Sequence, residues 1–271
     1  MSLPDWIGIF SLPFMQRAII GGVLFGILGG LLGSFLILRR LSLFGETVGH
    51  ASILGVVLAA LWQLPATWAL IVFTVCFGLG VVYLIERTNL STDTILSITL
   101  SGSVALGIIG LTFLGGYRGN LMSILFGDIL AIGNIDLILL LILLVITLIG
   151  LFLSLPDQIL LTLNADLAKV QGVPVQSYRY LFIILLSIAI ALAIRAVGVL
   201  LVNSFLVIPA ATARLVCGQF IPFLIASTGI GIVSAVTGMV VSGVFDLPSG
   251  PSIVLVQLIG FLGSAVWKSI S

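Results

Sequence analysis

Long runs of apolar residues follow one another along the chain, and short stretches with charges, prolines and polar clusters separate them. Leu, Ile, Gly and Ala dominate these runs, whose lengths are close to the roughly 20 residues that a helix needs to cross a bilayer. Open sheet edges cannot face lipid, so we expect helices and not a barrel. The pattern predicts nine spans, at approximately residues 17–38, 43–62, 66–86, 93–115, 135–155, 178–194, 197–216, 221–243 and 250–267.

The composition is that of a chain lying almost entirely in a membrane. Hydrophobic residues make up 61% of the 271 residues, charged residues make up 7%, and the mean hydropathy is +1.40. Such a chain has room for about eight to ten spans and for no aqueous domain of its own. The predicted fold is therefore all-α, a polytopic transmembrane helical bundle that forms a single domain over residues 1–271.

The sequence also argues against several functions. Ten Lys and Arg residues nearly cancel nine Asp and Glu residues, which argues against nucleic acid as a partner. The chain has no glycine-rich, lysine-containing phosphate-binding loop, so any energy from ATP must come from another polypeptide. A single histidine and the absence of an H-E-x-x-H pattern argue against an intramembrane metalloprotease. We expect a transport subunit that is not itself an enzyme.

Basic residues predict the orientation, because cytoplasmic loops carry an excess of Lys and Arg. With the N-terminus outside and the C-terminus in the cytoplasm, seven of the ten basic residues lie inside. The opposite orientation would place those seven outside. The inner residues are Arg39, Arg40, Arg87, Lys169, Arg179, Arg214 and Lys268, and the outer ones are Arg17, Arg118 and Arg195.

Two segments do not read as simple spans or loops. Residues 118–131 either lie along the outer surface, re-enter the membrane or span it, and a span would change both the helix count and the orientation. Residues 156–178 are predicted to lie inside and to contain a short helix from about Asn164 to Val170. Asn164 is the expected N-cap, and Gly172 the expected stop. Such a helix is suited to docking a soluble partner.

Small residues recur every fourth position in two of the predicted spans. Gly22, Gly26 and Gly30 form one series in the first span, and Ser234, Gly238 and Ser242 form another in the eighth. This spacing predicts that helix backbones approach closely. In the seventh span Pro209 is expected to break the helix, which is tolerated where freed carbonyl groups line a cavity.

Glu46 and His50 are the leading candidates for chemistry. They lie one helical turn apart in the second span, and His50 is the only histidine of the chain. Ionised side chains at mid-bilayer cost roughly 2.5–3.5 kcal/mol, so they usually mark an ion path or an internal partner. A carboxylate and a neutral imidazole suit Zn²⁺, Mn²⁺ or Fe²⁺. The alternative is a Glu–His pair whose members satisfy only each other.

Asp93 opens the fourth span on the same predicted side as Glu46 and His50, so it is the third candidate metal contact. The alternative reading is a cap or charge partner for the start of that helix, a role that Asp often has.

Four blocks of the sequence resemble one family in the same order. They are GSFLILRRLSLFGETVGHASILGVVLA, NADLAKVQGV, VGVLLVNSFLVIPAATARL and DLPSGPSIVL. Together they are similar to the permease subunits of zinc, manganese and iron ABC importers. A more distant similarity to the cobalamin branch includes the segment LSTDT, which lies by the cytoplasmic gate there and supports Asp93 as a path residue.

The resemblance implies a type II ABC importer fold and a homodimer in a bacterial plasma membrane. The partners it implies are cytoplasmic ATP-binding subunits and an extracytoplasmic metal-binding protein, with ATP bound by the ATPase and the metal ion carried as cargo. NADLAKVQGV would carry the contact with the ATPase, through Asp166, Ala168 and Gly172. Glu46 stands where members of the family often have Asp.

Two alternative transport functions stay open. One is an ABC permease for a metal chelate such as a siderophore, haem or cobalamin. The other is an ion-gradient-driven metal transporter, which would normally need carboxylates near the midplane and often an inverted repeat. The few carboxylates here lie mainly near the predicted span ends.

Overall fold

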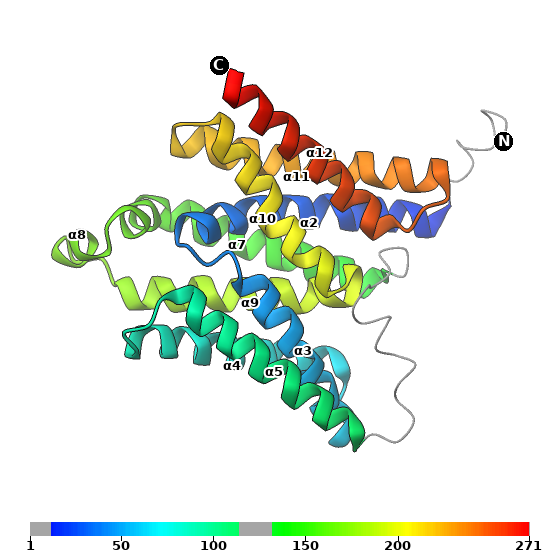
Figure 1. Cartoon of the computed structure of the whole chain (residues 1–271), viewed down its shortest axis with the longest axis horizontal. Helices are drawn as coiled ribbons and strands as arrows, with labels where there is room; N and C mark the ends of the chain where they lie inside the picture. The colour runs from blue at the N-terminus through cyan, green and yellow to red at the C-terminus, as the bar shows by residue number, and fades with distance from the viewer. Residues whose placement is uncertain (1–11, 114–131, 271) are drawn as a thin grey trace. The chain divides into compact units, whose positions relative to one another are not determined.

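The computed structural model describes residues 12–113 and 132–270, and these residues form helices without any strand (Figure 1). The predicted segment 118–131 lies outside the described residues. The helices are α2 (Pro13–Leu38), α3 (Phe44–Leu61), α4 (Ala66–Arg87), α5 (Thr92–Thr112), α7 (Asn134–Leu163), α8 (Ala165–Val170), α9 (Val175–Val197), α10 (Val199–Val216), α11 (Phe220–Phe245) and α12 (Ser249–Ile270).

These helices confirm the all-α fold and the expected order of spans. Among the described residues, eight helices are long and apolar enough to cross a membrane, and α10 is a shorter apolar helix. Most boundaries lie within three or four residues of those predicted. The chain divides into two compact units, and each unit is built from separate stretches of sequence. The single domain that the sequence predicts over residues 1–271 stays a prediction.

The first unit holds α2, α10, α11 and α12, and small residues allow its helices to approach closely. A β-carbon on Gly26 of α2 would come within 2.7 Å of the main chain of Gly231 in α11. One on Gly30 would come within 2.5 Å of the main chain of Thr228. The Ser227 hydroxyl donates a hydrogen bond to the Gly30 carbonyl oxygen across 2.9 Å. The glycine spacing in α2 therefore predicted the packing correctly.

Pro209 does not break its helix, which corrects the expectation from sequence. α10 is continuous from Val199 to Val216 with Pro209 inside it. A proline removes the N–H group that would bond to the carbonyl four residues earlier, here that of Phe205. That carbonyl oxygen lies against α2, where a β-carbon on Gly29 would come within 2.5 Å of it. Close packing at a glycine therefore accommodates the freed group, and the helix continues.

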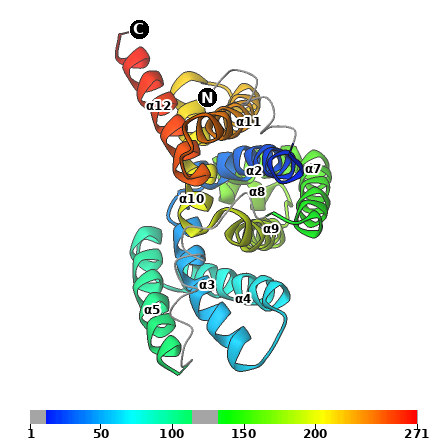
Figure 2. The same cartoon turned by 90° about the vertical axis from the view of Figure 1, so that its right-hand side faces the viewer.

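The second unit holds α3, α4, α5 and α8 with most of α7 and α9. Figure 2 shows α3 lying between α4 and α5. The Thr47 hydroxyl of α3 donates to the Leu96 carbonyl oxygen of α5, and further along Gly110 of α5 lies against Val57. α3 and α5 therefore run in the same direction and begin at the same end of the unit.

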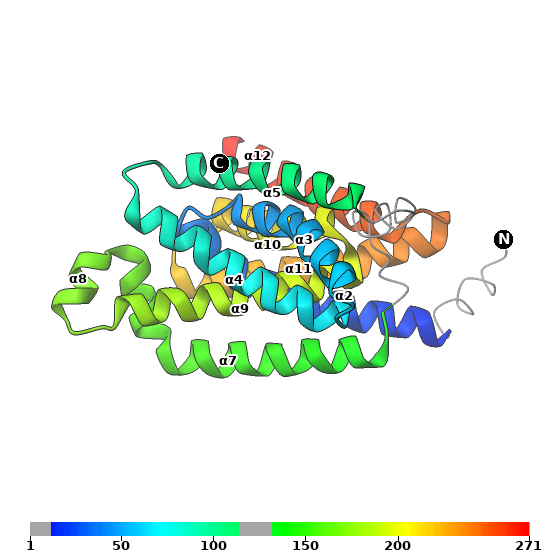
Figure 3. The same ribbon diagram turned by 90° about the horizontal axis from the view of Figure 1, so that it is seen from below.

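α7 is longer than expected, which is a second correction. The sequence placed its end near residue 155, before Pro156, but the helix continues through the proline to Leu163. The extra residues are held by neighbours, because Leu161 is buried and the Gln158 and Thr162 side chains accept hydrogen bonds from Arg39. These contacts outweigh the one backbone hydrogen bond that a proline removes. α8 then lies beyond the ends of α7 and α9 (Figure 3).

Candidate functional site

The two leading candidates lie at the start of α3. Glu46 is in the first turn of this helix, His50 lies one turn later, and both side chains are half-buried. Thr47, which lies between them, is fully buried against α5. The contact of Thr47 with α5 fixes the rotation of α3, and therefore the direction in which its neighbours Glu46 and His50 project.

The His50 ring is oriented by its own helix. Its Nδ1 atom lies 3.0 Å from the main-chain oxygen of Glu46. A carbonyl oxygen can only accept a hydrogen bond, so Nδ1 carries the proton and donates it. In a neutral imidazole this leaves the lone pair on Nε2, which is the arrangement found in metal-binding histidines.

The Glu46 carboxylate does not pair with the His50 ring. Within the described ranges, the ion pairs join Lys169 to Asp166 and Arg179 to Glu86. The alternative in which Glu46 and His50 satisfy only each other is therefore not what the structure contains. In the part of the chain that the structure describes, the Glu46 carboxylate makes no ion pair.

Asp93 lies in the first turn of α5 and is exposed. The N-cap of this helix is Ser91, whose hydroxyl accepts a hydrogen bond from the main-chain N–H of Thr94 across 3.3 Å. Asp93 is therefore not the capping residue. Because α3 and α5 begin at the same end of the unit, Asp93 lies at the same end as Glu46 and His50.

The three candidates do not form a closed metal site within one chain. Across residues 12–113 and 132–270, no group of three or more His, Cys, Asp and Glu side chains is placed to hold a metal ion. Glu46, His50 and Asp93 as metal contacts stay a prediction.

The candidate docking helix α8 has the predicted local structure. The Asn164 side chain caps it by accepting hydrogen bonds from the main-chain N–H groups of Asp166 and Leu167, each across 3.0 Å. Gly172 follows with φ +79°, a left-handed conformation that favours glycine at a helix end. The sequence had predicted both residues in these roles.

α8 rests on a small apolar core that the sequence did not reveal. Ala168 is fully buried and packs with Leu161 of α7 and Val175 of α9. Ala168 therefore faces the protein and can support a partner contact only by seating the helix. The outward side of this region instead presents Leu163, Leu167 and Val170, and Val170 is 85% exposed.

Polar contacts around α8 were also missed from sequence. The Tyr178 phenol donates a hydrogen bond to a carboxylate oxygen of Asp157 across 3.0 Å, which joins α9 to α7. Arg179 pairs with Glu86 of α4 across 2.7 Å, and Tyr180 donates to the same carboxylate across 3.0 Å. Polar residues such as Tyr178 and Arg179 at the start of an apolar span are a sequence signal for such contacts. Their partners could not be predicted, because Glu86 lies 93 residues from Arg179 in the sequence.

Comparisons with known proteins agree with this arrangement. The family model described as ABC 3 transport family matches residues 11–268. A solved structure titled PsaBC from Streptococcus pneumoniae in complex with Fab is similar, with a TM-score of 0.84 and 31% sequence identity. That match covers 97% of this chain and 95% of the other.

Two relatives are similar over almost their whole length. The High-affinity zinc uptake system membrane protein ZnuB of Haemophilus influenzae is 32% identical over 88% of this chain and 91% of that protein. The Manganese transport system membrane protein MntC of Halalkalibacterium halodurans is 32% identical over 92% of this chain and 85% of that protein. The names of these two relatives share metal transport and differ in the metal.

Proposed function

Because this chain belongs to the ABC 3 transport family, it is a membrane-spanning permease subunit of an ATP-driven importer and not itself an enzyme, and we propose that Glu46 and His50 contact its cargo. The cargo is a divalent transition-metal ion, Mn²⁺, Zn²⁺ or Fe²⁺. The two relatives described above are named for zinc uptake and for manganese transport. We therefore assign this chain to the class of divalent transition metals and do not choose one metal.

The hydrogen bond from Nδ1 of His50 to the Glu46 carbonyl oxygen carries the proposal. It leaves Nε2 able to donate a lone pair to a metal ion, one helical turn from a carboxylate that has no ion-pair partner in the described ranges. One oxygen and one nitrogen ligand suit borderline divalent cations. Asp93, at the same end of α5, would supply a further oxygen.

An incomplete site is what a transport path requires, because the ion must leave again. Two ligands from one chain would become four where a second copy places its own Glu46 and His50 across a shared axis. We therefore propose a homodimer in which the ion moves along the interface between the two copies.

Coupling to ATP hydrolysis is proposed to run through α8. Its exposed side chains Leu167 and Val170 form an apolar surface outside the spans, while the exposed Asp166 adds a charge beside it. Ala168 would seat the helix, and Gly172 would set the direction of the chain beyond it. A cytoplasmic ATP-binding subunit that presses on this surface would move α7 and α9 together.

The proposed membrane is the bacterial plasma membrane, with the N-terminus outside and the C-terminus in the cytoplasm. This orientation is supported by the excess of Lys and Arg in the segments that it places in the cytoplasm. The remaining proposed partner is an extracytoplasmic metal-binding protein that delivers the ion to the outer side.

The test is metal uptake into proteoliposomes that hold the complete importer, measured by elemental analysis of the vesicles. Glu46→Gln and His50→Ala should each reduce uptake at least tenfold, on the order of the loss expected for one metal contact. Co-purification with the ATPase should not change, because neither residue belongs to α8 or to the apolar core on which α8 rests.

A matched control is Asp246→Asn, which neutralises an exposed carboxylate at the C-terminal end of α11. This variant should transport normally. Normal uptake by both Glu46→Gln and His50→Ala would remove these residues from the path.

A further inference from the structure

A cavity of about 330 Å³ lies in the second unit, where helix ends meet. The last turns of α2, α4 and α7 reach it, and so do the first turns of α5, α8 and α9. None of Glu46, His50 and Asp93 lines it. The proposed metal contacts therefore do not form its walls, although Thr92, the neighbour of Asp93, does.

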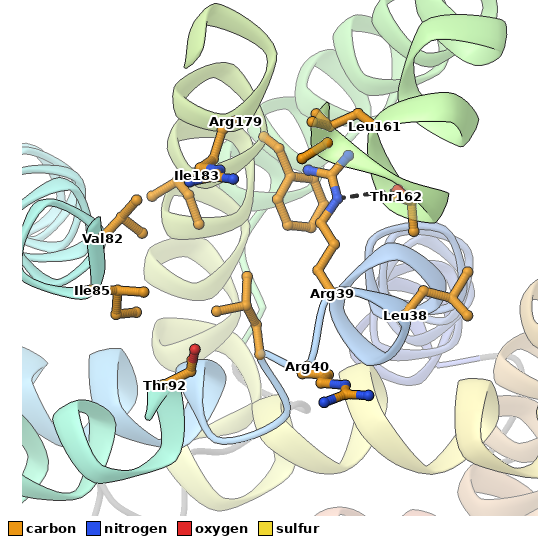
Figure 4. A pocket seen from close by; sticks show the side chains of 13 residues that line it. Leu38, Arg39, Arg40, Val82, Ile85, Thr92, Leu161, Thr162, Arg179 and Ile183 are labelled. Atoms are coloured by element: carbon orange, nitrogen blue, oxygen red, sulfur yellow. Dashed lines mark hydrogen bonds between the residues drawn. The ribbon is translucent and has the colours of Figure 1, made fainter. Parts of the chain in front are cut away.

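Three arginines line the cavity, and no Asp or Glu is among its lining residues. Arg39 and Arg40 come from the turn after α2, and Arg179 comes from α9 (Figure 4). Arg179 forms an ion pair with Glu86 of α4. Arg40 is exposed, with the left-handed φ of +57° that turns the chain here.

The guanidinium groups of Arg39 and Arg179 are held in place by the protein. Arg39 donates a hydrogen bond from Nε to the Thr162 hydroxyl across 3.3 Å, and its guanidinium carbon lies 4.5 Å from the centre of the Phe182 ring. Burial and the positive charge of Arg179 lower the pKa of Arg39 to about 10, so it is still charged at neutral pH. The fold thus holds the positive charges of Arg39 and Arg179 close enough to repel each other. An anion between these two guanidinium groups would relieve that repulsion.

Apart from Thr92 and Thr162, the other residues that line the cavity are apolar. Val82 and Ile85 of α4 form one part, and Leu161, Phe182 and Ile183 form another. A soluble anion would gain nothing from these side chains, whereas a molecule with a charged head and a hydrocarbon body would use both surfaces. Basic pockets between spans at the cytoplasmic side are places where anionic lipid headgroups bind.

We propose that this cavity binds the phosphate-bearing headgroup of an anionic phospholipid, with Arg39, Arg40 and Arg179 around the phosphate. The beginning of an acyl chain would lie against the apolar walls. The lipid would join the turn after α2 to α9 and would hold the helix ends around α8 together. This inference concerns a lipid site and does not depend on which residues contact the metal.

The experiment uses the full-length chain in lipid nanodiscs. One set contains phosphatidylcholine alone, and the other contains an equimolar mixture of phosphatidylcholine and phosphatidylglycerol. Phosphatidylglycerol should raise the unfolding temperature of the protein. In detergent, titration with phosphatidylglycerol followed by native mass spectrometry should show saturable binding, and Arg40→Gln should weaken it about fivefold, as expected for one arginine near the headgroup.

Arg87→Gln is the matched control, because Arg87 is an exposed arginine in the last turn of α4 that does not line the cavity. It should bind phosphatidylglycerol like the unmodified protein. Equal weakening by Arg87→Gln would mean general attraction to a basic surface and would overturn the proposal. Stabilisation by inorganic phosphate alone, with no added effect of phosphatidylglycerol, would assign the site to a soluble phosphate and would overturn the lipid as occupant.

A second measurement does not require a variant to fold. A photoactivatable phosphatidylglycerol is added to the unmodified protein, and the labelled peptides are identified by mass spectrometry. Labels in the turn after α2 and in the first turns of α9 support the site. Labels found only elsewhere on the chain overturn it.

Discussion

Tyr178 and Asp157 join the two helices that flank α8, through a hydrogen bond of 3.0 Å from the phenol to the carboxylate. The bond lies beside the apolar core on which α8 rests, since Tyr178 also packs against that core. It therefore holds α7 and α9 at a fixed spacing below the proposed docking surface.

Tyr178→Phe should reduce transport-coupled ATP hydrolysis several-fold while the protein still assembles. The change removes one hydrogen bond, worth about 1 kcal/mol, and keeps the ring in place. Tyr180→Phe is the control, because it makes the same change on the same helix at a bond to Glu86 of α4. ATP hydrolysis by the reconstituted importer, with and without loaded binding protein, is the measurement. Equal effects of the two variants would argue against a special role for the Tyr178 bond.

Asn164→Ala should weaken binding of the ATPase subunit about tenfold. Loss of an N-cap costs about 0.5–2 kcal/mol, and α8 has only six residues over which to recover it. Asn164→Asp retains a capping oxygen and should bind normally. The affinity of the detergent-solubilised permease for the ATPase checks this, and an Asn164→Ala variant with unchanged affinity would show that the cap is dispensable for docking.

Gly231→Ala should destabilise the first unit by about 1–3 kcal/mol, because the added methyl group would overlap the main chain of Gly26. Gly229→Ala lies two residues earlier in the same helix, where an added β-carbon has nothing within 4 Å. It should be neutral or slightly stabilising, since Ala favours a helix. Thermal unfolding of the two purified variants gives the comparison, and equal stability would mean that α2 and α11 can separate without cost.

The sequence predicted the helices well because each span has its own apolar run and its own polar boundaries. It also predicted the α8 cap and stop, since Asn164 and Gly172 act on backbone groups within a few residues. The glycine series in α2 predicted close packing, although the partners in α10 and α11 were not visible from spacing alone.

The errors arose where a distant contact decides the outcome. Pro156 and Pro209 both lie inside helices, because packing against other segments outweighs the local loss of a hydrogen bond. The direction of Ala168 could not be predicted either, since a six-residue helix has too few turns for its buried face to show in the pattern. For His50, the sequence left open a pairing with the Glu46 side chain, and the structure has a hydrogen bond to the Glu46 main-chain oxygen instead.

The parallel arrangement of α3 and α5 has an electrostatic consequence for any cation that passes. Each helix start carries roughly half an elementary positive charge, so two adjacent starts repel a cation about as strongly as one fixed charge would. Glu46 and Asp93 lie in those first turns and supply two negative charges. These two carboxylates more than offset the positive potential that a cation on the proposed path would otherwise meet at the two helix starts.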